Sequence, residues 1–511
     1  MNHIIRKSAG SCGKNDGSAR RARLGVVAAG IALGIVAGGC TLARSADEQV
    51  AERLGRYRDE AATTATAYGD ANWRAPAPVP AGTTGLSPAE SPPTEPARLR
   101  EFIVVALGNN PQIEAAEERA RAQAERVAQV TALPDPTVMT KTLPEPVRTA
   151  EGDNYFVLGV QQKFPIPGKL DHAGRAALHD LQAALEQVQA QRLAVIADVK
   201  RAYFRIYVID QTIVIDQTNQ DLVRGLVDVA RSQSASGQRT QGDALRAQVE
   251  LSDLQSQIIS LRQERARAVA QLNRLLSRSP DTEIPAVAPF DLRTVDLAVD
   301  RLFGLAEDSN PQLAGLRAQI DRAQEQLEVA KLAWWPDFTL GFEWMYMDGR
   351  RAFQPPPNPQ TGMVPVVSRM SEDGSDNWAI TFGFNLPIWV DRVQAQIAEA
   401  RHRKLAAQAE YAAERDRVRY RIEDALARVR AQQELGILFR DTIIPQAQQA
   451  YEVSRAAYTT GGTEFLLVVD NWQKWLTFSV QYHRALGELE VAVADLEEAI
   501  GLSVSAAEAG S

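Results

Sequence analysis

Apolar and polar side chains alternate along residues 378–389, WAITFGFNLPIW. Every second position is apolar, at Trp378, Ile380, Phe382, Phe384 and Leu386, and the positions between them are Ala379, Thr381, Gly383 and Asn385. Because successive side chains of a strand point to opposite faces, this pattern predicts a β-strand that is apolar on one face only. A helix-forming run without proline follows from about residue 391 and continues to Pro445.

Three further strands are expected at residues 135–143, 155–164 and 338–347. The second and third show the same alternation, whereas the first alternates poorly and is predicted from its place in an internal repeat. Each is about ten residues long, which is the length of a tilted strand that crosses a bilayer. A soluble sandwich, in which the apolar strand faces meet in a core, is the alternative.

The number of strands bears on how many chains are needed. Four strands are too few to close a barrel within one chain, because small closed barrels need about eight. Open strand edges are not tolerated in lipid. If the strands are membranous, several subunits must therefore share one barrel.

An internal duplication sets the expected fold class. The recurring groups are NPQI at 110–113 with NPQL at 310–313, LPD at 133–135 with WPD at 335–337, FPI at 164–166 with LPI at 386–388, and Gly237, Leu272 and Leu276 with Gly461, Leu496 and Ile500. Each half contains a helix, two strands joined by a loop, a long helix, a glycine turn and a returning helix. The expected fold is mainly α with a membrane β portion, in repeats at 98–290 and 291–502 followed by a short tail at 503–511.

The long helices are expected at residues 170–236 and 391–460, and their returning partners at 243–276 and 464–500. At a rise of about 1.5 Å per residue, each long helix reaches about 100 Å. Apolar positions in them are small and sparse among Ala, Gln and Arg, as expected for helices that pack side by side in a wall or coiled coil. The sequence thus predicts two coiled-coil hairpins whose tips lie far from the strands.

The N-terminus has the features of a cleaved signal peptide. Six basic residues precede an apolar run at 24–39, which is short for a spanning helix, so residues 1–39 are expected to be removed. The small residues before Cys40 resemble the bacterial lipobox, although Ala37 stands where leucine is usual. Cys40 is therefore the expected lipidation site, and a plain signal peptide with an incidental cysteine is the alternative.

The segment after Cys40 suggests where the protein resides. Thr41 is not the aspartate that holds lipoproteins at the inner membrane, so a lipid-anchored protein of the outer membrane, extending into the periplasm, is expected. Seven prolines lie between residues 76 and 96. Residues 40–97 are therefore expected to form the anchor and an extended linker.

Charge and composition exclude several function classes. Removal of residues 1–39, which contain six basic groups and one acid, changes the formal net charge from −8 to about −13. This balance argues against a nucleic-acid partner and suits a lumen that passes cations or neutral solutes.

Motifs for catalysis and for metal binding are missing from the sequence. The two cysteines, Cys12 and Cys40, allow neither a disulfide framework nor a CxxC metal site. The five histidines have no HxxxH or HExxH spacing, and no GxSxG or phosphate-binding glycine loop occurs. No cofactor, no resident metal and no enzymatic activity are expected.

Taken as a set, these motifs resemble the TolC family of outer membrane factors. The similarity lies in the duplicated plan, the LPDP and WPDF strand starts, the QQKFPIPGKL segment after the second strand and the two glycine tips. The resemblance implies a homotrimer whose twelve strands form one barrel in outer-membrane lipid and whose helices form a periplasmic α-barrel. It also implies docking on a periplasmic adaptor protein and on a proton-driven inner-membrane efflux pump.

The resemblance also suggests a periplasmic gate at the hairpin tips. Asp470 falls where the family has a lumen-facing aspartate, and three copies would form a ring that attracts cations. Leu467 stands where a second aspartate is found in the family, so the ring is expected to be thinner. The positions of a companion latch are Thr463 and Gly242, which cannot form it as the family does.

Four more residues are assigned by the same comparison. Asp243 and Tyr458 match positions that hydrogen-bond between hairpins and hold the closed state. The alternatives are a helix N-cap for Asp243 and a packed aromatic for Tyr458. The adaptor is expected to grip the tips near Gly237 and Gly461.

The function expected from this resemblance is a passive exit duct of a tripartite efflux system. The QQKFPIPGKL segment resembles the subgroup that serves heavy-metal efflux, so metal cations or drugs are the expected cargo. An exit duct for type I protein secretion is one alternative. A periplasmic adaptor or coiled-coil structural protein is another, although an adaptor would have one hairpin flanked by lipoyl and small β-barrel segments.

Overall fold

The computed structural model describes residues 44–56, 96–149, 152–235, 241–287, 289–295, 298–349, 357, 359–363 and 374–504. These residues form two compact units. The sheet unit contains Thr131–Asp171 and Asp337–Asn385, and the helical unit contains the described residues of Ala43–Val130, His172–Pro336 and Leu386–Ser511. Cys40, Gly237 and the proline-rich part of the predicted linker lie outside the described residues.

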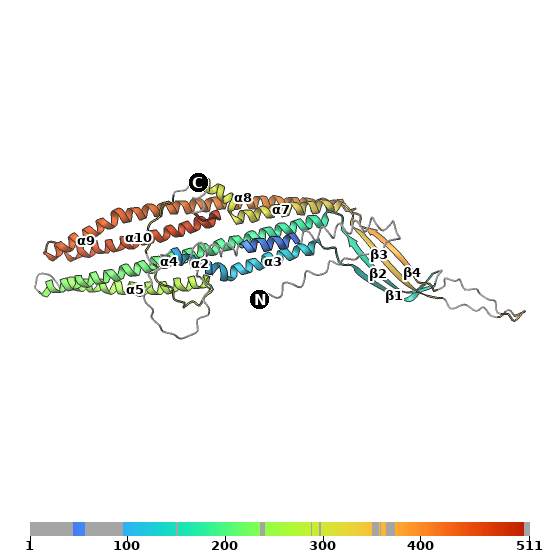
Figure 1. The fold of residues 1–511 in the computed structure, drawn as a ribbon, viewed down its shortest axis with the longest axis horizontal. Helices are drawn as coiled ribbons and strands as arrows, with labels where there is room; N and C mark the ends of the chain where they lie inside the picture. Colours follow the sequence, from blue (N-terminus) through green and yellow to red (C-terminus); the bar gives the residue numbers. More distant parts are fainter. Residues whose placement is uncertain are drawn as a thin grey trace. The chain divides into compact units, whose positions relative to one another are not determined.

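The sheet unit is a four-stranded antiparallel sheet in the order β1-β2-β3-β4 (Figure 1). Its strands are β1 (Thr137–Arg148), β2 (Asp153–Phe164), β3 (Phe338–Asp348) and β4 (Asn377–Phe384). All four predicted strands are therefore present.

Strand register places the predicted apolar sets on one face of the sheet. Phe342 of β3 lies opposite Val160 of β2 on one side and Ile380 of β4 on the other. Following these pairs across the sheet, the face carries Val138, Thr140, Thr142, Phe156, Leu158, Val160, Gln162, Phe164, Phe338, Leu340, Phe342, Trp344, Tyr346, Trp378, Ile380, Phe382 and Phe384. The opposite face carries Thr137, Met139, Lys141, Val157, Gly159, Gln161, Lys163, Thr339, Gly341, Glu343, Met345, Asn377, Ala379, Thr381 and Gly383. One face is thus mainly apolar, as predicted, although Gln162 and the threonines of β1 interrupt it and Met139, Val157 and Met345 lie on the other face.

Two strand ends differ from the prediction. β1 extends to Arg148, past the predicted end at 143, and the register shifts between Thr142 and Val147, where Pro144 and Pro146 lie. Prolines are tolerated there because an edge strand with a bulge does not need every backbone N–H in its ladder. β4 ends at Phe384, so the predicted strand, whose alternation was followed to Leu386, is two residues too long.

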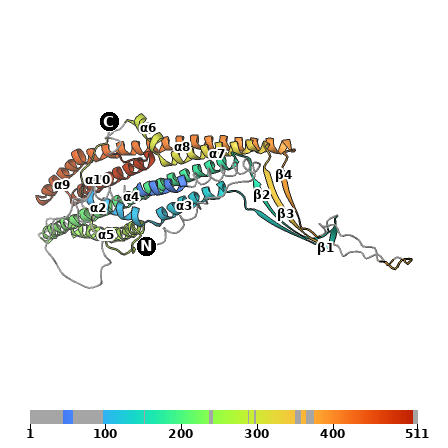
Figure 2. The same cartoon turned by 45° about the vertical axis from the view of Figure 1, so that its right-hand side comes forward.

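Helices make up the second unit. They are α2 (Pro96–Asn109), α3 (Pro111–Thr131), α4 (Lys169–Ala235), α5 (Gln241–Leu275), α6 (Val299–Ser309), α7 (Pro311–Lys331), η1 (Leu332–Trp334), α8 (Val390–Leu438), the π-helix η2 (Phe439–Ile443), α9 (Ile444–Thr459) and α10 (Phe465–Ile500). In both views α4 lies beside α5 and α9 beside α10, as the two predicted hairpins require (Figures 1 and 2). None of the helices within the described ranges combines the length and the apolar composition that crossing a membrane would need.

The second long helix is interrupted by η2, which the sequence analysis did not anticipate. Pro445 is the second residue of α9, two positions after the end of η2 at Ile443. Proline has no N–H for the helical ladder, and its ring would clash with the carbonyl four residues earlier. A π-turn widens the backbone at that point, so the helix can continue past the proline.

Two asparagines at equivalent positions of the repeats tie helix ends together. Asn310 is 2 % exposed, caps α7 by accepting from the N–H groups of Gln312 and Leu313, and donates through Nδ2 to the carbonyl of Ala499 at 2.8 Å. Asn110 accepts from the N–H of Gln112 at 2.9 Å and donates to the carbonyl of Leu275 at 3.2 Å. Each side chain thereby satisfies both the start of one helix and the end of another.

The core of the helical unit forms three clusters. The first joins α2, α3, α4 and α5 around Tyr207 and Leu272, and the second joins α6, α7, α8 and α10 around Ile422 and Leu496. These two clusters are the counterparts expected of a duplicated chain. The third lies between the two hairpins and contains residues from α4, α5, α9 and α10.

Part of the predicted linker is folded. Residues 44–56 form a helix, with Ala46 and Leu54 buried. Arg53 of this helix hydrogen-bonds to Glu186 of α4. The chain is therefore attached to the helical unit soon after Cys40, before the proline-rich stretch.

Candidate functional site

The predicted contact between the hairpins is present. Tyr458 of α9 is fully buried, and its ring lies 5.4 Å from that of Phe465. Its hydroxyl donates to Oδ2 of Asp243 of α5 at 3.4 Å. Asp243 lies in the first turn of α5, where the helix dipole favours a negative charge. The tyrosine is packed, as its alternative role requires, whereas Asp243 is the third residue of α5 and is therefore not its N-cap.

Two more hydrogen bonds join the hairpins nearby. The indole Nε1 of Trp472 donates to Oδ1 of Asn219 at 2.6 Å, and both residues are buried. The amide of Gln473 donates to Oε2 of Glu250 at 2.9 Å. Sequence reasoning missed both pairs, because Trp472 and Asn219 are 253 residues apart and nothing in their local sequence links them.

Asp470 has a cationic neighbour that changes its expected role. Lys474, one helical turn later in α10, places Nζ 2.8 Å from Oδ2 of Asp470, and the two side chains are 58 % and 49 % exposed. The spacing of four residues is visible in the sequence and is typical of helical ion pairs. A ring of Asp470 side chains would therefore carry a ring of ammonium groups beside it.

The second hairpin turns at Gly461. Its φ of +80° lies in the left-handed region that favours glycine. The N–H groups of Gly461 and Gly462 donate to the carbonyls of Tyr458 at 3.1 Å and Ala457 at 2.8 Å, which caps the end of α9. The same turn thus fixes the end of the helix that carries Tyr458.

A separate polar cluster lies within the sheet unit, at Asp337. Its carboxylate is 3.1 Å from the ammonium groups of both Lys163 and Lys169 and accepts from the N–H of Ile166 at 3.2 Å. The N–H of Asp337 donates to Oδ1 of Asn385 at 2.6 Å, and the N–H of Asn385 donates back to the carbonyl of Asp337 at 3.3 Å. In the register of β3 and β4, Asp337 would be the next residue opposite Asn385, and the side-chain Oδ1 of Asn385 takes the place of its backbone carbonyl as the acceptor for the Asp337 N–H. This replacement is consistent with the end of β4 at Phe384.

No metal centre is found in the described part of the chain. No group of three or more His, Cys, Asp or Glu side chains there is placed to hold a metal ion. The contacts described above are hydrogen bonds and ion pairs between helices and strands.

Comparison with known proteins identifies a family of outer membrane proteins. Residues 102–278 and 302–502 match the family described as "Outer membrane efflux protein". The cobalt-zinc-cadmium resistance protein CzcC of Cupriavidus metallidurans is 21 % identical over 410 residues, which cover 80 % of this chain and 90 % of that protein.

Solved structures show the same fold. The outer-membrane channel OprN superposes with a TM-score of 0.66 at 17 % identity, covering 80 % of this chain and 90 % of that one. The outer membrane protein VceC of Vibrio cholerae gives a TM-score of 0.64 at 20 % identity, covering 80 % of this chain and 97 % of that one. The two family segments match the two repeats of the chain. The protein therefore belongs to the outer membrane efflux protein family, the TolC-like outer membrane factors, and is a channel of the outer membrane that extends into the periplasm and not an enzyme.

Proposed function

We propose that three copies of this chain share one twelve-stranded barrel and that the assembly is the passive exit duct of a tripartite efflux system. The observation that carries the proposal is the sheet itself. Within the described residues it has four strands, with β1 and β4 at its edges, and one face is mainly apolar. Edges must be paired inside a bilayer, so a neighbouring sheet is needed at each.

The apolar side chains of the sheet are exposed in the single chain, which supports the proposal that lipid surrounds this face. On β4, Trp378, Ile380 and Phe382 are 66 %, 66 % and 65 % exposed. Burying one large apolar side chain contributes about 1.5–3 kcal/mol, so β4 alone would gain several kcal/mol on entering hydrocarbon. The opposite face, with Lys141 and Glu343, suits a water-filled lumen.

Cargo and partners are proposed from the CzcC relative and from the charge of the chain. The printed name of the CzcC relative refers to cobalt, zinc and cadmium, and the acidic balance of the chain suits cations, so metal cations or cationic drugs are the proposed cargo. A periplasmic adaptor would bind the tips at Gly237 and Gly461, and a proton-driven inner-membrane pump would supply the energy. Lipidation at Cys40 would anchor each subunit in the outer membrane.

The gate belongs to the same proposal. The hydrogen bond between Tyr458 and Asp243 holds the two hairpins of one subunit together in the closed state. Asp470 and Lys474 face the solvent as a pair, so their combined charge sets the selectivity of the entrance. Separation of the hairpins would break the contact and widen the periplasmic end.

A pair of neighbouring substitutions on β4 tests the barrel. Phe382→Lys puts a charge on the apolar face, which costs about 2–4 kcal/mol near the bilayer midplane. Thr381→Lys puts the same charge on the opposite face. The first variant is expected to lose chemically crosslinked trimers and conductance in planar bilayers, and the second to retain trimers with reduced cation conductance. A wild-type protein that stays monomeric without channels, or equal behaviour of the two variants, would refute the barrel.

A growth assay tests the cargo. The full chain is expressed together with a periplasmic adaptor and an inner-membrane pump of a heavy-metal efflux system in a host that lacks its own exit duct. Raised tolerance to zinc, cobalt or cadmium, lost in Phe382→Lys, is the expected result. Tolerance to cationic dyes without any change for metals would assign drugs as the cargo, and secretion of a protein without either would assign the type I secretion role.

A further inference from the structure

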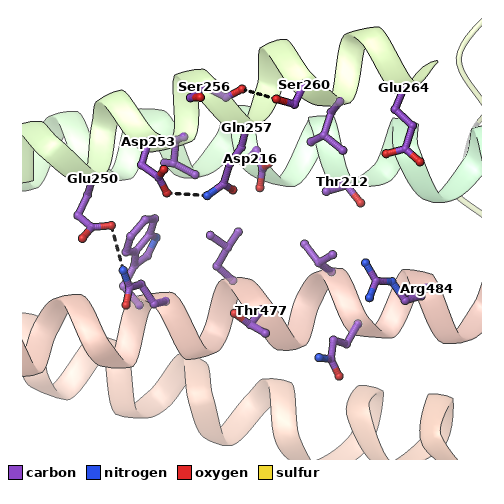
Figure 3. A pocket seen from close by; sticks show the side chains of 17 residues that line it. Thr212, Asp216, Glu250, Asp253, Ser256, Gln257, Ser260, Glu264, Thr477 and Arg484 are labelled. Carbon is purple, nitrogen blue, oxygen red and sulfur yellow. Dashed lines mark hydrogen bonds between the residues drawn. The ribbon is translucent and has the colours of Figure 1, made fainter. Parts of the chain in front are cut away.

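A groove of about 640 Å³ lies between the two hairpins of the helical unit, lined by α4, α5 and α10 (Figure 3). This volume is in the range of small-molecule sites, about 300–1,000 Å³. It lies between the hydrogen bond of Trp472 with Asn219 and the aromatic cluster around Tyr207 and His483. Nothing in the proposed export route uses it.

Acidic side chains dominate the polar lining of the groove. The carboxylates are Asp216 from α4 and Glu250, Asp253 and Glu264 from α5, and Arg484 from α10 is the one guanidinium among the lining residues. Figure 3 shows them around the space between α5 and α10. The groove therefore has an excess of negative charge.

Asp216 differs from the other three acids. The others have partners: Gln473 for Glu250 at 2.9 Å, Gln257 for Asp253 at 2.6 Å and Arg205 for Glu264 at 3.1 Å. Asp216 is 3 % exposed, and it makes no hydrogen bond or ion pair with any described residue. Buried charges in folded proteins are normally paired with an opposite charge. No described residue supplies a cation to this carboxylate, so its charge is left uncompensated.

Burial makes Asp216 a weaker acid than an exposed aspartate. It raises the pKa of Asp216 to about 6. At neutral pH the carboxylate is therefore mostly ionised, although it lies against a wall with little water. A bound cation would compensate for this cost.

The remaining walls indicate what kind of cation fits. Leu254, Leu261, Leu476 and Val480 provide an apolar surface beside the acids. The described acids are not grouped closely enough to replace the hydration shell of a metal ion. A bare metal ion would also leave the apolar wall without contact. The lining thus favours an organic cation over a metal.

We propose that this groove binds an amphiphilic organic cation, with its positive charge at Asp216 and its apolar body against the leucines of α5 and α10. The site lies between helices of one subunit, and it requires neither the barrel nor the export function. A cation bound there contacts both hairpins, so occupancy favours their association.

Ethidium is a suitable probe, with neutral phenanthridine as the comparator of similar shape. Binding to the purified full-length protein is measured by fluorescence polarisation for ethidium and by competition for phenanthridine. Asp216→Asn is expected to weaken ethidium binding about tenfold or more and to leave phenanthridine unchanged, because only a charge-assisted contact is lost. Asp221→Asn, on the same helix with a 76 % exposed side chain, is the matched control and is expected to bind as wild type.

A second variant and a pH series distinguish loss of the site from misfolding of Asp216→Asn. Thr477→Trp fills the groove from an exposed position of α10 and is expected to abolish binding while conductance is kept. The titratable and charged groups facing Asp216 are the three acids of α5 and Arg484 of α10. Ethidium affinity of the wild type is expected to fall as the pH drops through about 6, and the affinity of Asp216→Asn to stay flat.

Several results would overturn the site. They are ethidium binding no tighter than phenanthridine, Asp216→Asn equal to Asp221→Asn, or unchanged binding in Thr477→Trp. Since conductance is measured on the same samples, wild-type protein that forms intact channels and does not bind ethidium would reject the groove and not the channel.

Discussion

Replacing Asn310 by alanine removes a side chain that caps two helices at once. Its Oδ1 accepts from two N–H groups at the start of α7, and its Nδ2 donates to the carbonyl of Ala499, the last residue but one of α10. Carbonyls in the last turn of a helix have no partner within that helix. The substitution therefore leaves polar groups at both helix ends unsatisfied in a buried place.

The size of the effect follows from the two losses. An N-cap contributes about 0.5–2 kcal/mol. A buried carbonyl without its donor costs about 1–3 kcal/mol. Asn310→Ala is thus expected to lower the free energy of unfolding by about 1.5–5 kcal/mol, which is a large fraction of the stability of a typical domain. Asn110→Ala is expected to cost less, because its bond to Leu275 is longer and it caps one N–H only.

Thermal unfolding followed by far-ultraviolet circular dichroism measures the change, at one protein concentration because the subunits associate. Asn310→Ser is the graded control, since its short hydroxyl can still cap α7 and cannot reach the carbonyl of Ala499. Its midpoint is expected between those of the wild type and Asn310→Ala. A wild-type midpoint for Asn310→Ala would refute the double cap, and identical midpoints for serine and alanine would refute the contribution of the N-cap.

Three further predictions concern the gate and the groove. Asp470→Ala leaves the Lys474 ammonium without its carboxylate, so the cation-to-anion permeability ratio in bilayers is expected to fall. Lys474→Ala is expected to raise this ratio. Ratios equal to that of the wild type in both variants would exclude both residues from the entrance. Tyr458→Phe removes a bond of about 0.5–1.5 kcal/mol per subunit, so single-channel open probability is expected to rise several-fold, and an unchanged value contradicts the latch. Burial raises the pKa of Asp216 from 3.8 to about 6 in the folded state, so the ionised carboxylate destabilises the fold. Asp216→Asn is therefore expected to be more stable than wild type by about 3 kcal/mol above pH 6, and this difference is expected to vanish towards pH 4. A stability difference that does not depend on pH would show that the group is not buried as a charge.

Strands and hairpins were predictable because their patterns are local. A period of two in β4 and a proline-free run of weakly apolar helix need only neighbouring residues to be recognised. The duplication then supplied β1, whose own alternation is poor. The end of β4 was missed because it depends on Asn385 bonding to Asp337, 48 residues away.

One folded segment was missed although its pattern was present. Ala46, Val50 and Leu54 are spaced by four, which is the spacing of one helix face, and the first and last are buried. Because prolines are frequent farther along this range, the whole of residues 40–97 was predicted to be anchor and linker. The helix at 44–56 shows that this part of the range is folded.

The candidate site was predictable only in part, because its contacts join distant segments. The pair of Asp243 and Tyr458 came from the family resemblance and not from their own surroundings. Lys474 could have been found from its spacing to Asp470. The unpaired Asp216 could not, because an acid within an apolar helical run shows its burial only after the second hairpin has packed against it.

The duplication also indicates how the seams of the proposed barrel differ. Within one chain, the seam between the repeats is fixed by Asp337, which attracts a lysine from β2 and another from the start of α4. The equivalent acid of the first repeat is Asp135, which is exposed.

In a trimer, the counterparts of the two lysines would come from the second repeat of the neighbouring subunit. The repeat places Asn385 and Asp391 at those positions. Neither can form an ion pair with Asp135, and the second has the same charge. In the proposed trimer, that seam would rely more on backbone hydrogen bonds and on apolar contacts in lipid, and the latter form only after insertion. On this reasoning the sheet of a single chain can fold before assembly, whereas closure of the barrel waits for the membrane.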